Sequence, residues 1–241
     1  MPTRTVQGGE IPRRPPVIFT LGGGPRAHRK DPPVQLASPT PLRRFAKLVT
    51  EVLAPWVWVV WLPAAIGWSA TGTAFGALVW GAVVAVFGAV IPMAVIVHGA
   101  RRGRWDNHHV TRREDRLVPL LTCVGSVGVG IAVLALAGAP HEMVALAAAM
   151  VSTLVVTTAI TLAPGGRGWK ISVHSGVAFG AIAILAIQSG PWWALLWAAS
   201  ALVAWSRVEL GDHTTGQVCG GAVLGVLGGG GIYSAGLVLL G

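Results

Sequence analysis

The chain has 241 residues, of which 53% are hydrophobic and 11% are charged, with a formal net charge of +9. A soluble domain carries about 25% charged residues, so this composition excludes an ordinary soluble enzyme and a coiled coil. The two cysteines, Cys123 and Cys219, lie in separate apolar segments, which excludes a disulfide scaffold. Between apolar segments, a positive charge indicates contact with anionic lipid or phosphate rather than with nucleic acid. We therefore expect an integral membrane protein.

Residues 1–45 differ from the rest of the chain because they are rich in proline, glycine and arginine. Such a segment buries too little apolar surface to offset the entropy of ordering, so we interpret it as a disordered basic tail. No apolar core follows its early basic residues within the length of a secretory signal, which argues against a cleaved signal. Two interpretations of the tail stay open: a solvated segment without a role, and weak attachment to anionic headgroups.

Seven apolar segments follow the tail. Because a backbone in lipid must satisfy its own hydrogen bonds, each segment is expected to be a helix. We expect an all-α transmembrane bundle of six to seven helices, with a first transmembrane helix at 46–72 and a core at 73–241. The fifth and sixth segments are short for a full crossing, and it stays open whether the first one spans. The segments cover approximately residues 52–69, 73–98, 118–138, 142–163, 174–189, 191–205 and 217–240.

The basic residues of the chain, 18 in all, are confined to alternate connections between these segments. Nine lie in the tail and its junction through Lys47, six in the 99–117 loop, two in the 164–173 loop and one in the 206–216 loop. This bias predicts a multi-pass protein of the cell membrane with the tail and the three polar loops in the cytoplasm. Seven crossings would then leave Gly241 outside.

Glycines are expected to set the closest helix contacts. Gly176 with Gly180, and Gly221 with Gly225, recur at the four-residue spacing that places small residues on one helix face. We expect these faces to pack tightly rather than to form a flexible gate. The run from Gly228 to Gly231 is expected to weaken the last helix locally, since glycine in a helix costs about 1 kcal/mol relative to alanine.

The three polar loops each combine histidine with basic residues. Two helices separate each loop from the next, so all three emerge on one side of the membrane and are expected to converge. Arginine and lysine bind phosphoryl oxygens, while one imidazole attacks phosphorus and a second protonates the leaving oxygen. No pair of aspartates has the spacing to hold magnesium, and no loop has cysteine and histidine at zinc-ligand spacing. We therefore expect a histidine mechanism without a metal or another cofactor.

These loops resemble the signature of the phosphatidic acid phosphatase type 2 superfamily, which consists of membrane lipid phosphatases and their relatives. The third loop, Ser206-Arg207-x5-His213, is similar to the family motif S-R-x5-H-x3-D. The second loop, Ile171-Ser-Val-His174, keeps the serine and histidine of P-S-G-H, and the first, His109-x6-Arg116, keeps the arginine of K-x6-R-P. The resemblance covers about residues 73–240. One motif alone is weak evidence, but three in the family's order are specific.

The resemblance implies a role for each matching residue. His213 would be the nucleophile that forms a phosphohistidine, and His174 the general acid for the leaving oxygen. Gln217 stands where the family has the aspartate that orients the nucleophile. The residues expected to bind the phosphoryl oxygens are His109, Arg116, Ser172 and Arg207, with the neighbouring cation Lys170 and the backbone N–H groups that begin the fifth apolar segment.

Three positions depart from the family pattern. His109 replaces a lysine and donates only when it is protonated or in the right tautomer, so Arg112 and Arg113 are alternative donors. Leu117 replaces a proline, which changes the rigidity of the loop. Gln217 can accept the imidazole N–H, but an amide stabilises an imidazolium less than a carboxylate does. Asp212 and Glu209 therefore stay open as alternatives for this orienting role.

We expect a phosphatase that acts on a lipid or polyprenyl phosphate, or on the corresponding diphosphate, at the cytoplasmic leaflet. The apolar part of the substrate would lie between helices. Few lysines beside abundant alanine, glycine, valine and arginine are typical of a GC-rich bacterium. Two alternatives stay open: a pseudo-phosphatase that binds phospholipid without turnover, and a lipid transporter or scramblase. Neither the particular lipid phosphate nor the oligomeric state follows from the sequence.

Overall fold

Helices are the regular structure of the residues that the computed structural model describes, which are 40–105, 110, 112, 114–163 and 168–241. These residues contain no strand, as expected for an all-α protein. The helices are α1 (Pro41–Val52), α2 (Pro55–Thr71), α3 (Ala74–Ala85), α4 (Ile91–Arg101), α5 (Leu117–Leu136), α6 (His141–Leu162), α7 (Val173–Ser189), α8 (Trp197–Glu209), α9 (Thr215–Val223) and α10 (Ile232–Leu240). Shorter turns are η1 (Val86–Val90), η2 (Glu114–Arg116), η3 (Pro191–Leu196) and η4 (Leu224–Gly231).

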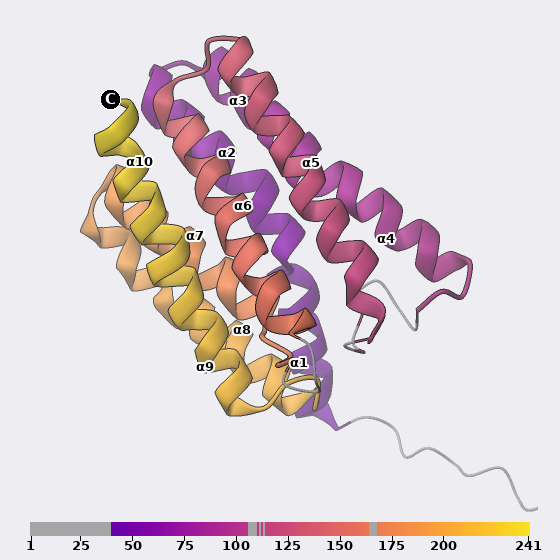
Figure 1. Cartoon of the computed structure of the whole chain (residues 1–241). Coiled ribbons are helices and arrows are strands. Elements are labelled where there is room, and N and C mark those ends of the chain that lie inside the picture. Colours follow the sequence, from indigo (N-terminus) through magenta and orange to yellow (C-terminus); the bar gives the residue numbers. More distant parts are fainter. Residues whose placement is uncertain (1–39, 106–109, 111, 113, 164–167) are drawn as a thin grey trace, which may run out of the picture. The chain divides into compact units, whose positions relative to one another are not determined.

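Each of the seven predicted apolar segments is helical (Figure 1). Within the described residues, four helices are long and apolar enough to cross a membrane: Ala74–Arg101, Leu117–Leu136, His141–Leu162 and Thr215–Leu240. A fifth span is possible if α1 and α2, which meet at a bend of 41°, form one crossing. Helix α7 is apolar but only 17 residues long, as its sequence predicted. The chain therefore has the helices of a multi-pass membrane protein.

Helix α1 begins at Pro41, inside the segment predicted to be a tail, whose residues 1–39 lie outside the described part of the chain. The Thr40 side chain accepts a hydrogen bond from the Arg43 amide and so caps the helix, and Pro41 suits the first turn because its missing N–H needs no partner. The helix ends where Ala54 is extended before Pro55, the conformation that a following proline favours.

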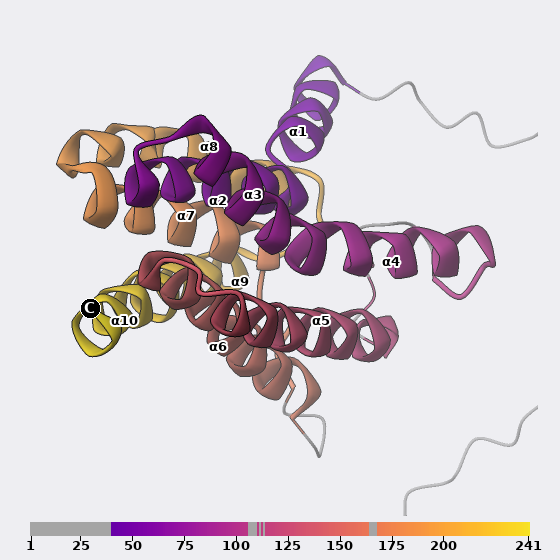
Figure 2. The same ribbon diagram turned by 90° about the horizontal axis from the view of Figure 1, so that it is seen from above.

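Helix α7 is the most deeply buried helix of the bundle and packs against α2, α8, α9 and η4 (Figure 2). Its first turns carry Gly176 and Gly180, and a Cβ built on Gly225 would overlap the Gly176 carbonyl and the Gly180 amide. The predicted close packing of the two glycine pairs is therefore confirmed. This contact fixes the first half of α7 against the start of η4.

Two π-helical turns interrupt the longest helices. The glycine run predicted to weaken the last helix lies in η4, and the helix continues beyond it as α10. In η1 the main-chain carbonyl of Phe87 accepts a hydrogen bond of 2.6 Å from the Ser126 hydroxyl of α5. Beyond η1, α4 runs out from the bundle beside α5 (Figures 1 and 2).

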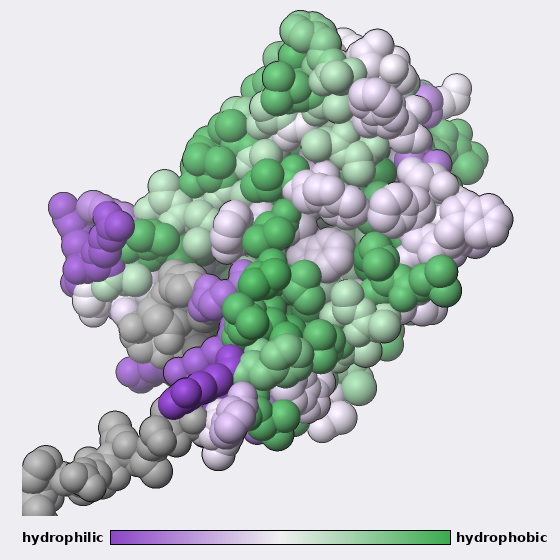
Figure 3. Space-filling model, turned by 180° about the vertical axis from the view of Figure 1, so that it is seen from behind, coloured by the Kyte–Doolittle hydropathy of each residue, from purple (hydrophilic) through white to green (hydrophobic). Residues whose placement is uncertain are grey.

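The polar connections gather at one end of the bundle. Hydrogen bonds join Arg116 to Ile171 and Lys170 to Asp212, so the three loops meet as their spacing along the chain predicts. The face shown in Figure 3 is largely hydrophobic, with one hydrophilic patch at the left edge of the view and others in its lower left part. The end at which the three loops meet holds the candidate site.

We expect Gly225→Ala to lower the free energy of unfolding by about 1–3 kcal/mol, because the new methyl group meets backbone atoms of α7 that cannot rotate away. Gly231→Ala is the matched control, since the same π-helical turn holds open space around that position. Thermal unfolding of both full-length variants in one detergent measures the difference. Equal midpoints for the two variants would contradict the close approach of α7 and η4.

Candidate active site

Arg116 connects the first polar loop to the second. It ends η2 directly before α5, and its side chain is buried. Its Nε donates to the Val110 carbonyl at 3.1 Å, and its Nη1 donates to the Ile171 carbonyl at 3.2 Å. Two backbone acceptors from different loops therefore hold this guanidinium in one orientation.

The second loop enters α7 through Ser172. The Ser172 hydroxyl caps the helix by accepting a hydrogen bond from the Ser175 amide at 3.3 Å. The Ser172 main-chain amide donates to the main-chain carbonyl of Gln217 at 3.2 Å. His174 follows in the first turn and is buried, with 7% of its surface exposed. The helix start thus joins Ser172 to the main chain of Gln217 and places His174 in the first turn of α7.

Arg207 is the most deeply buried cation of this site, with 1% of its surface exposed near the end of α8. Its Nη2 pairs with Asp212 at 2.9 Å, while its Nε and Nη1 have no hydrogen-bond partner among the described residues. Buried guanidinium nitrogens without a partner are costly. An anion that accepts from these two nitrogens would remove that cost.

The chain between α8 and α9 is folded around the same arginine. The main-chain carbonyl of Arg207 accepts from the amides of Asp212, at 3.1 Å, and His213, at 3.2 Å. Gly211 provides the left-handed backbone that this tight turn requires, with φ of 77°. Asp212, one of the alternatives for orienting His213, pairs with Arg207 instead.

His213 is buried, and its Nδ1 lies between two oxygens. The distances are 3.2 Å to Gln217 Oε1 and 3.2 Å to the Lys170 carbonyl. The Thr214 amide donates to the same Oε1 at 3.2 Å as part of a capping box, which fixes the orientation of the Gln217 amide. Because both neighbours of Nδ1 are acceptors, this nitrogen carries the proton and Nε2 keeps its lone pair.

The surroundings of His213 keep its imidazole neutral. Burial, followed by the nearby charges of Arg116, Lys170 and Arg207, lowers the pKa of His213 to about 3, against the opposing effect of its hydrogen bond to Gln217. Burial and Arg207 also lower the pKa of Arg116 to about 10, against the opposing effect of Asp212. Arg116 therefore stays charged at neutral pH.

Among the described residues, three cations share this site with the carboxylate of Asp212, and Glu51 of α1 also lies within electrostatic reach of Arg207. Lys170 Nζ donates to the Asp212 carbonyl, which brings it to the turn that carries Arg207. Arg116, Lys170 and Arg207 all act on the pKa of His213, so all three lie within electrostatic reach of its ring. Together with Asp212 they leave an excess of positive charge around a neutral imidazole. The arrangement favours a multiply charged oxyanion.

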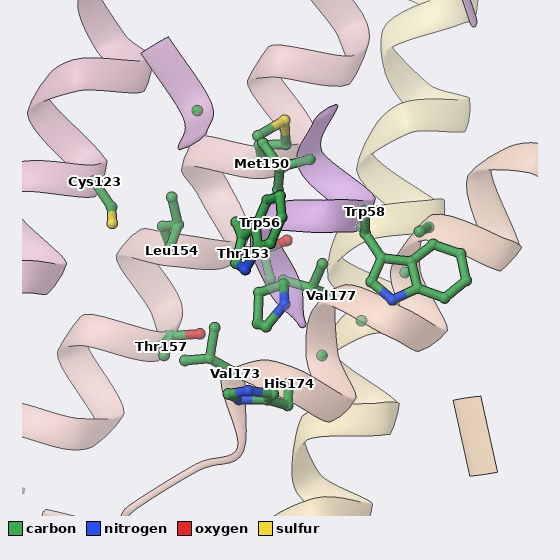
Figure 4. Close-up of a pocket in the computed structure, with 18 of the residues that line it drawn as sticks. Trp56, Trp58, Cys123, Met150, Thr153, Leu154, Thr157, Val173, His174 and Val177 are labelled. Atoms are coloured by element: carbon green, nitrogen blue, oxygen red, sulfur yellow. The ribbon is translucent and has the colours of Figure 1, made fainter. Parts of the chain in front are cut away.

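An apolar cavity of about 240 Å³ reaches the same end of the bundle. Its lining includes Arg116, Ser172 and His174, whereas Lys170, Arg207 and His213 lie outside it. Figure 4 shows His174 with side chains of α2, α5 and α6 around the cavity, among them Trp56, Cys123 and Met150. Arg116 therefore belongs both to the cavity wall and to the basic cluster of Arg116, Lys170 and Arg207.

Hydrogen bonds and electrostatic contacts connect most of the predicted site residues: Arg116, Lys170, Ser172, Arg207, His213 and Gln217. His174 lines the cavity together with Arg116 and Ser172. His109 and Arg113 lie outside the described residues. Arg112, the other alternative donor, is exposed and pairs with Asp115 at 3.9 Å. Its side chain therefore contacts its own loop.

Two contributions were missing from the sequence-based prediction. The Lys170 carbonyl is an acceptor for His213, and main-chain atoms carry no residue-specific signal. Helix α2, which lies outside the family resemblance, lines the cavity through Trp56 and Trp58. The pattern Thr214-x-x-Gln217 is a capping-box signal that was available in the sequence and places the Gln217 side chain back toward residue 214.

The comparisons with known proteins give no relative for this chain. Neither a family model, nor a curated protein, nor a solved structure matches it. Among the described residues, no group of three or more histidine, cysteine, aspartate or glutamate side chains has the arrangement of a metal site. Inferences about function therefore rest on the geometry of this site.

We expect the His213 imidazole to remain neutral and protonated at Nδ1 down to about pH 5, because burial and three cations disfavour its charged form. An unfolded histidine takes up its proton near pH 6.5, so protonation favours the unfolded chain. The free energy of unfolding should accordingly fall as the pH is lowered from about 6.5. Nitrogen NMR of histidine-labelled protein, assigned with His213→Gln, measures both tautomer and titration. Titration of His213 near pH 6.5 would contradict the site electrostatics.

Proposed function

We propose that this protein is a membrane lipid phosphatase of the phosphatidic acid phosphatase type 2 kind, acting through a phosphohistidine intermediate. The observation that carries the proposal is that the third polar loop holds two buried groups, the His213 imidazole and the Arg207 guanidinium. His213 presents a lone pair on Nε2, and Arg207, six residues earlier, has two buried nitrogens that find no partner in the described part of the chain. A neutral nucleophile beside an unsatisfied cation is suited to attack on a phosphoryl group.

In the proposed reaction, His213 Nε2 forms a bond to phosphorus as the bond to the leaving oxygen breaks. His174 gives a proton to that oxygen, so the lipid leaves as an alcohol or, from a diphosphate, as a monophosphate. Water then attacks phosphorus, with its proton passing to His174, and the P–N bond breaks to release inorganic phosphate. Gln217 Oε1 and the Lys170 carbonyl hold the Nδ1 proton throughout.

The cations of the site would neutralise the phosphoryl oxygens during both steps. Arg207 offers its unpartnered Nε and Nη1, and Arg116 and Lys170 add charge from the neighbouring loops. The amide groups that begin α7 at Ser172 provide further donors at a helix N-terminus. His109, outside the described residues, is proposed as an additional phosphate-binding residue on the basis of its position in the first motif.

An apolar substrate is favoured by the cavity that ends at this site. Its wall is formed mainly by hydrophobic side chains, with Arg116, Ser172 and His174 as its polar residues nearest the basic cluster. We propose that the hydrocarbon part of a lipid or polyprenyl phosphate, or of a diphosphate, occupies it. The headgroup then lies at the cytoplasmic leaflet of the cell membrane, in a core of six to seven crossings.

Purified full-length protein should release inorganic phosphate from one or more members of a panel of lipid and polyprenyl phosphates, and His213→Ala should lower the rate at least about 10³-fold. His141→Ala is the matched control, because this histidine lies at the first residue of α6, at the opposite end of the helix from the second polar loop. There it pairs with Glu142. EDTA should leave the rate unchanged, and a strict requirement for a divalent ion would contradict the histidine mechanism.

Two other outcomes of that experiment identify the alternatives. Binding of lipid phosphates to the protein without release of phosphate from any of them would favour a pseudo-phosphatase, for which the replacement of aspartate by Gln217 is the reason. Movement of lipid between leaflets that survives His213→Ala would favour a transporter or scramblase.

A series at residue 217 tests how the nucleophile is oriented. Gln217→Glu keeps the length of the side chain and an acceptor for the His213 Nδ1 proton, so we expect at least the wild-type kcat. Gln217→Leu removes one of the two acceptors of this proton and leaves the Lys170 carbonyl, so we expect a loss of kcat that stays below the about 10⁴-fold loss that follows from the wrong tautomer. Steady-state kinetics on one substrate compares the variants. A Gln217→Leu protein that is folded and as active as the wild type would contradict the role given to Gln217.

A further inference from the structure

Helix α1 carries an amphipathic surface that the proposed reaction does not use. Over one stretch of twelve residues its charged side chains, Arg43, Arg44, Lys47 and Glu51, share one side. At 3.6 residues per turn, the apolar side chains occupy the remaining arc of the helix. The helix therefore has one polar face and one wide apolar face.

Part of the apolar arc is covered by α8. Ala46, Val49 and Thr50 are buried there, and the Thr50 hydroxyl forms a hydrogen bond of 3.0 Å with that of Ser206. Arg43 Nη2 donates to the Leu210 carbonyl at 3.3 Å, at the end of the same helix. These contacts fix the rotation of α1 about its own axis, so the direction of its remaining faces is determined.

The rest of the apolar arc is largely exposed among the described residues, although the Phe45 ring also contacts the Trp205 ring of α8, with centroids 5.9 Å apart. Leu42, Phe45, Leu48 and Val52 are 53%, 47%, 59% and 57% exposed. The cations beside this arc, Arg43, Arg44 and Lys47, are exposed as well. The exposed surface of α1 is thus an apolar strip bordered by positive charge.

We infer that α1 is an interfacial helix that binds an anionic lipid surface. The apolar strip matches the acyl boundary of a bilayer, and the three cations match the phosphate groups of anionic headgroups. The bend of 41° before α2 allows α1 to leave the direction of the following apolar helix. The exposed Trp56, in the first turn of α2, is the residue type that lies at a membrane–water interface.

A lipid surface fits this helix better than either burial in the membrane or a protein partner. Four charged residues in one twelve-residue helix disfavour a place in the hydrocarbon core. Because Ser206 precedes Arg207, lipid binding by α1 would also hold the helix that carries the site.

Spin labels on full-length protein in vesicles test this inference. In a background of Cys123→Ala and Cys219→Ser, a nitroxide is attached at Leu48→Cys or, as the matched position on the polar face, at Lys47→Cys. Adjacent residues of a helix lie at nearly the same height and differ mainly in direction. In phosphatidylcholine vesicles containing phosphatidylglycerol, the label at 48 should collide with oxygen, and the label at 47 with a water-soluble nickel chelate.

Lipid charge gives the second readout. Replacing phosphatidylglycerol by phosphatidylcholine should reduce the immersion of the label at 48. Arg44→Gln with Lys47→Gln should reduce the effect of phosphatidylglycerol on the immersion of the label at 48, by about fivefold for each charge removed. Arg101→Gln with Arg102→Gln, exposed cations at the end of α4, is the control and should leave it unchanged.

Three results would overturn the inference. Both labels buried in lipid would make α1 part of a membrane span, and both labels in water would make it a solvated helix. Immersion of the label at 48 that does not depend on lipid charge would show an apolar contact without recognition of anionic headgroups. None of these readouts uses phosphatase activity, so they are independent of the proposed reaction.

Discussion

The buried guanidinium of Arg207 is the group on which the rest of the site depends. The main-chain carbonyl of Arg207 accepts hydrogen bonds from the amides of Asp212 and His213, and the Arg207 side chain pairs with the Asp212 carboxylate. One residue therefore shapes the turn and also supplies its positive charge. A buried cation is stable only when its charge and its donors are satisfied. Asp212 pairs with Nη2 of Arg207, while Nε and Nη1 have no acceptor among the described residues. The protein thus keeps a preformed deficit of acceptors at the position where an oxyanion would bind, and the neutral imidazole of His213 avoids adding a further charge to it.

Close backbone packing is what allows these groups to meet. Glycines at 176, 180, 221 and 225 let α7 approach α9 and η4 without intervening side chains. The Ser172 amide then reaches the Gln217 carbonyl, and the Lys170 carbonyl reaches the His213 ring. With a larger side chain at 225 the two helices would separate by the thickness of a methyl group. Both hydrogen bonds are near 3.2 Å already, so the separation would break them first.

Sequence patterns predicted the elements and the convergence of the loops well, because both follow from strong physical signals. Apolar runs require helices in lipid, and the alternation of basic connections places Arg116, Lys170 and Arg207 on one side. The first residues of the amphipathic α1 were assigned to the tail, because Arg43 and Arg44 continue the composition of the preceding basic segment. The cavity was expected only in general terms, since its wall combines α2, α5, α6 and α7 through side-chain shapes that no motif encodes. The choice between Gln217 and Asp212 also needed coordinates, because both residues lie close to His213 along the chain.

The replacement of a carboxylate by Gln217 follows a consistent electrostatic logic. A carboxylate at residue 217 would add a negative charge near Arg116 and Arg207, whereas an amide orients the imidazole and leaves the positive charge of the site unchanged. The amide has a fixed polarity through its bond from Thr214, so it selects the Nδ1 tautomer as a carboxylate would. What it lacks is stabilisation of a positively charged ring. In the proposed reaction the phosphohistidine would carry its charge beside a dianionic phosphoryl group, which supplies that stabilisation from the substrate side. The cost of the exchange therefore falls mainly on the leaving-group step, where the ring becomes positive before the phosphoryl group is fully bonded.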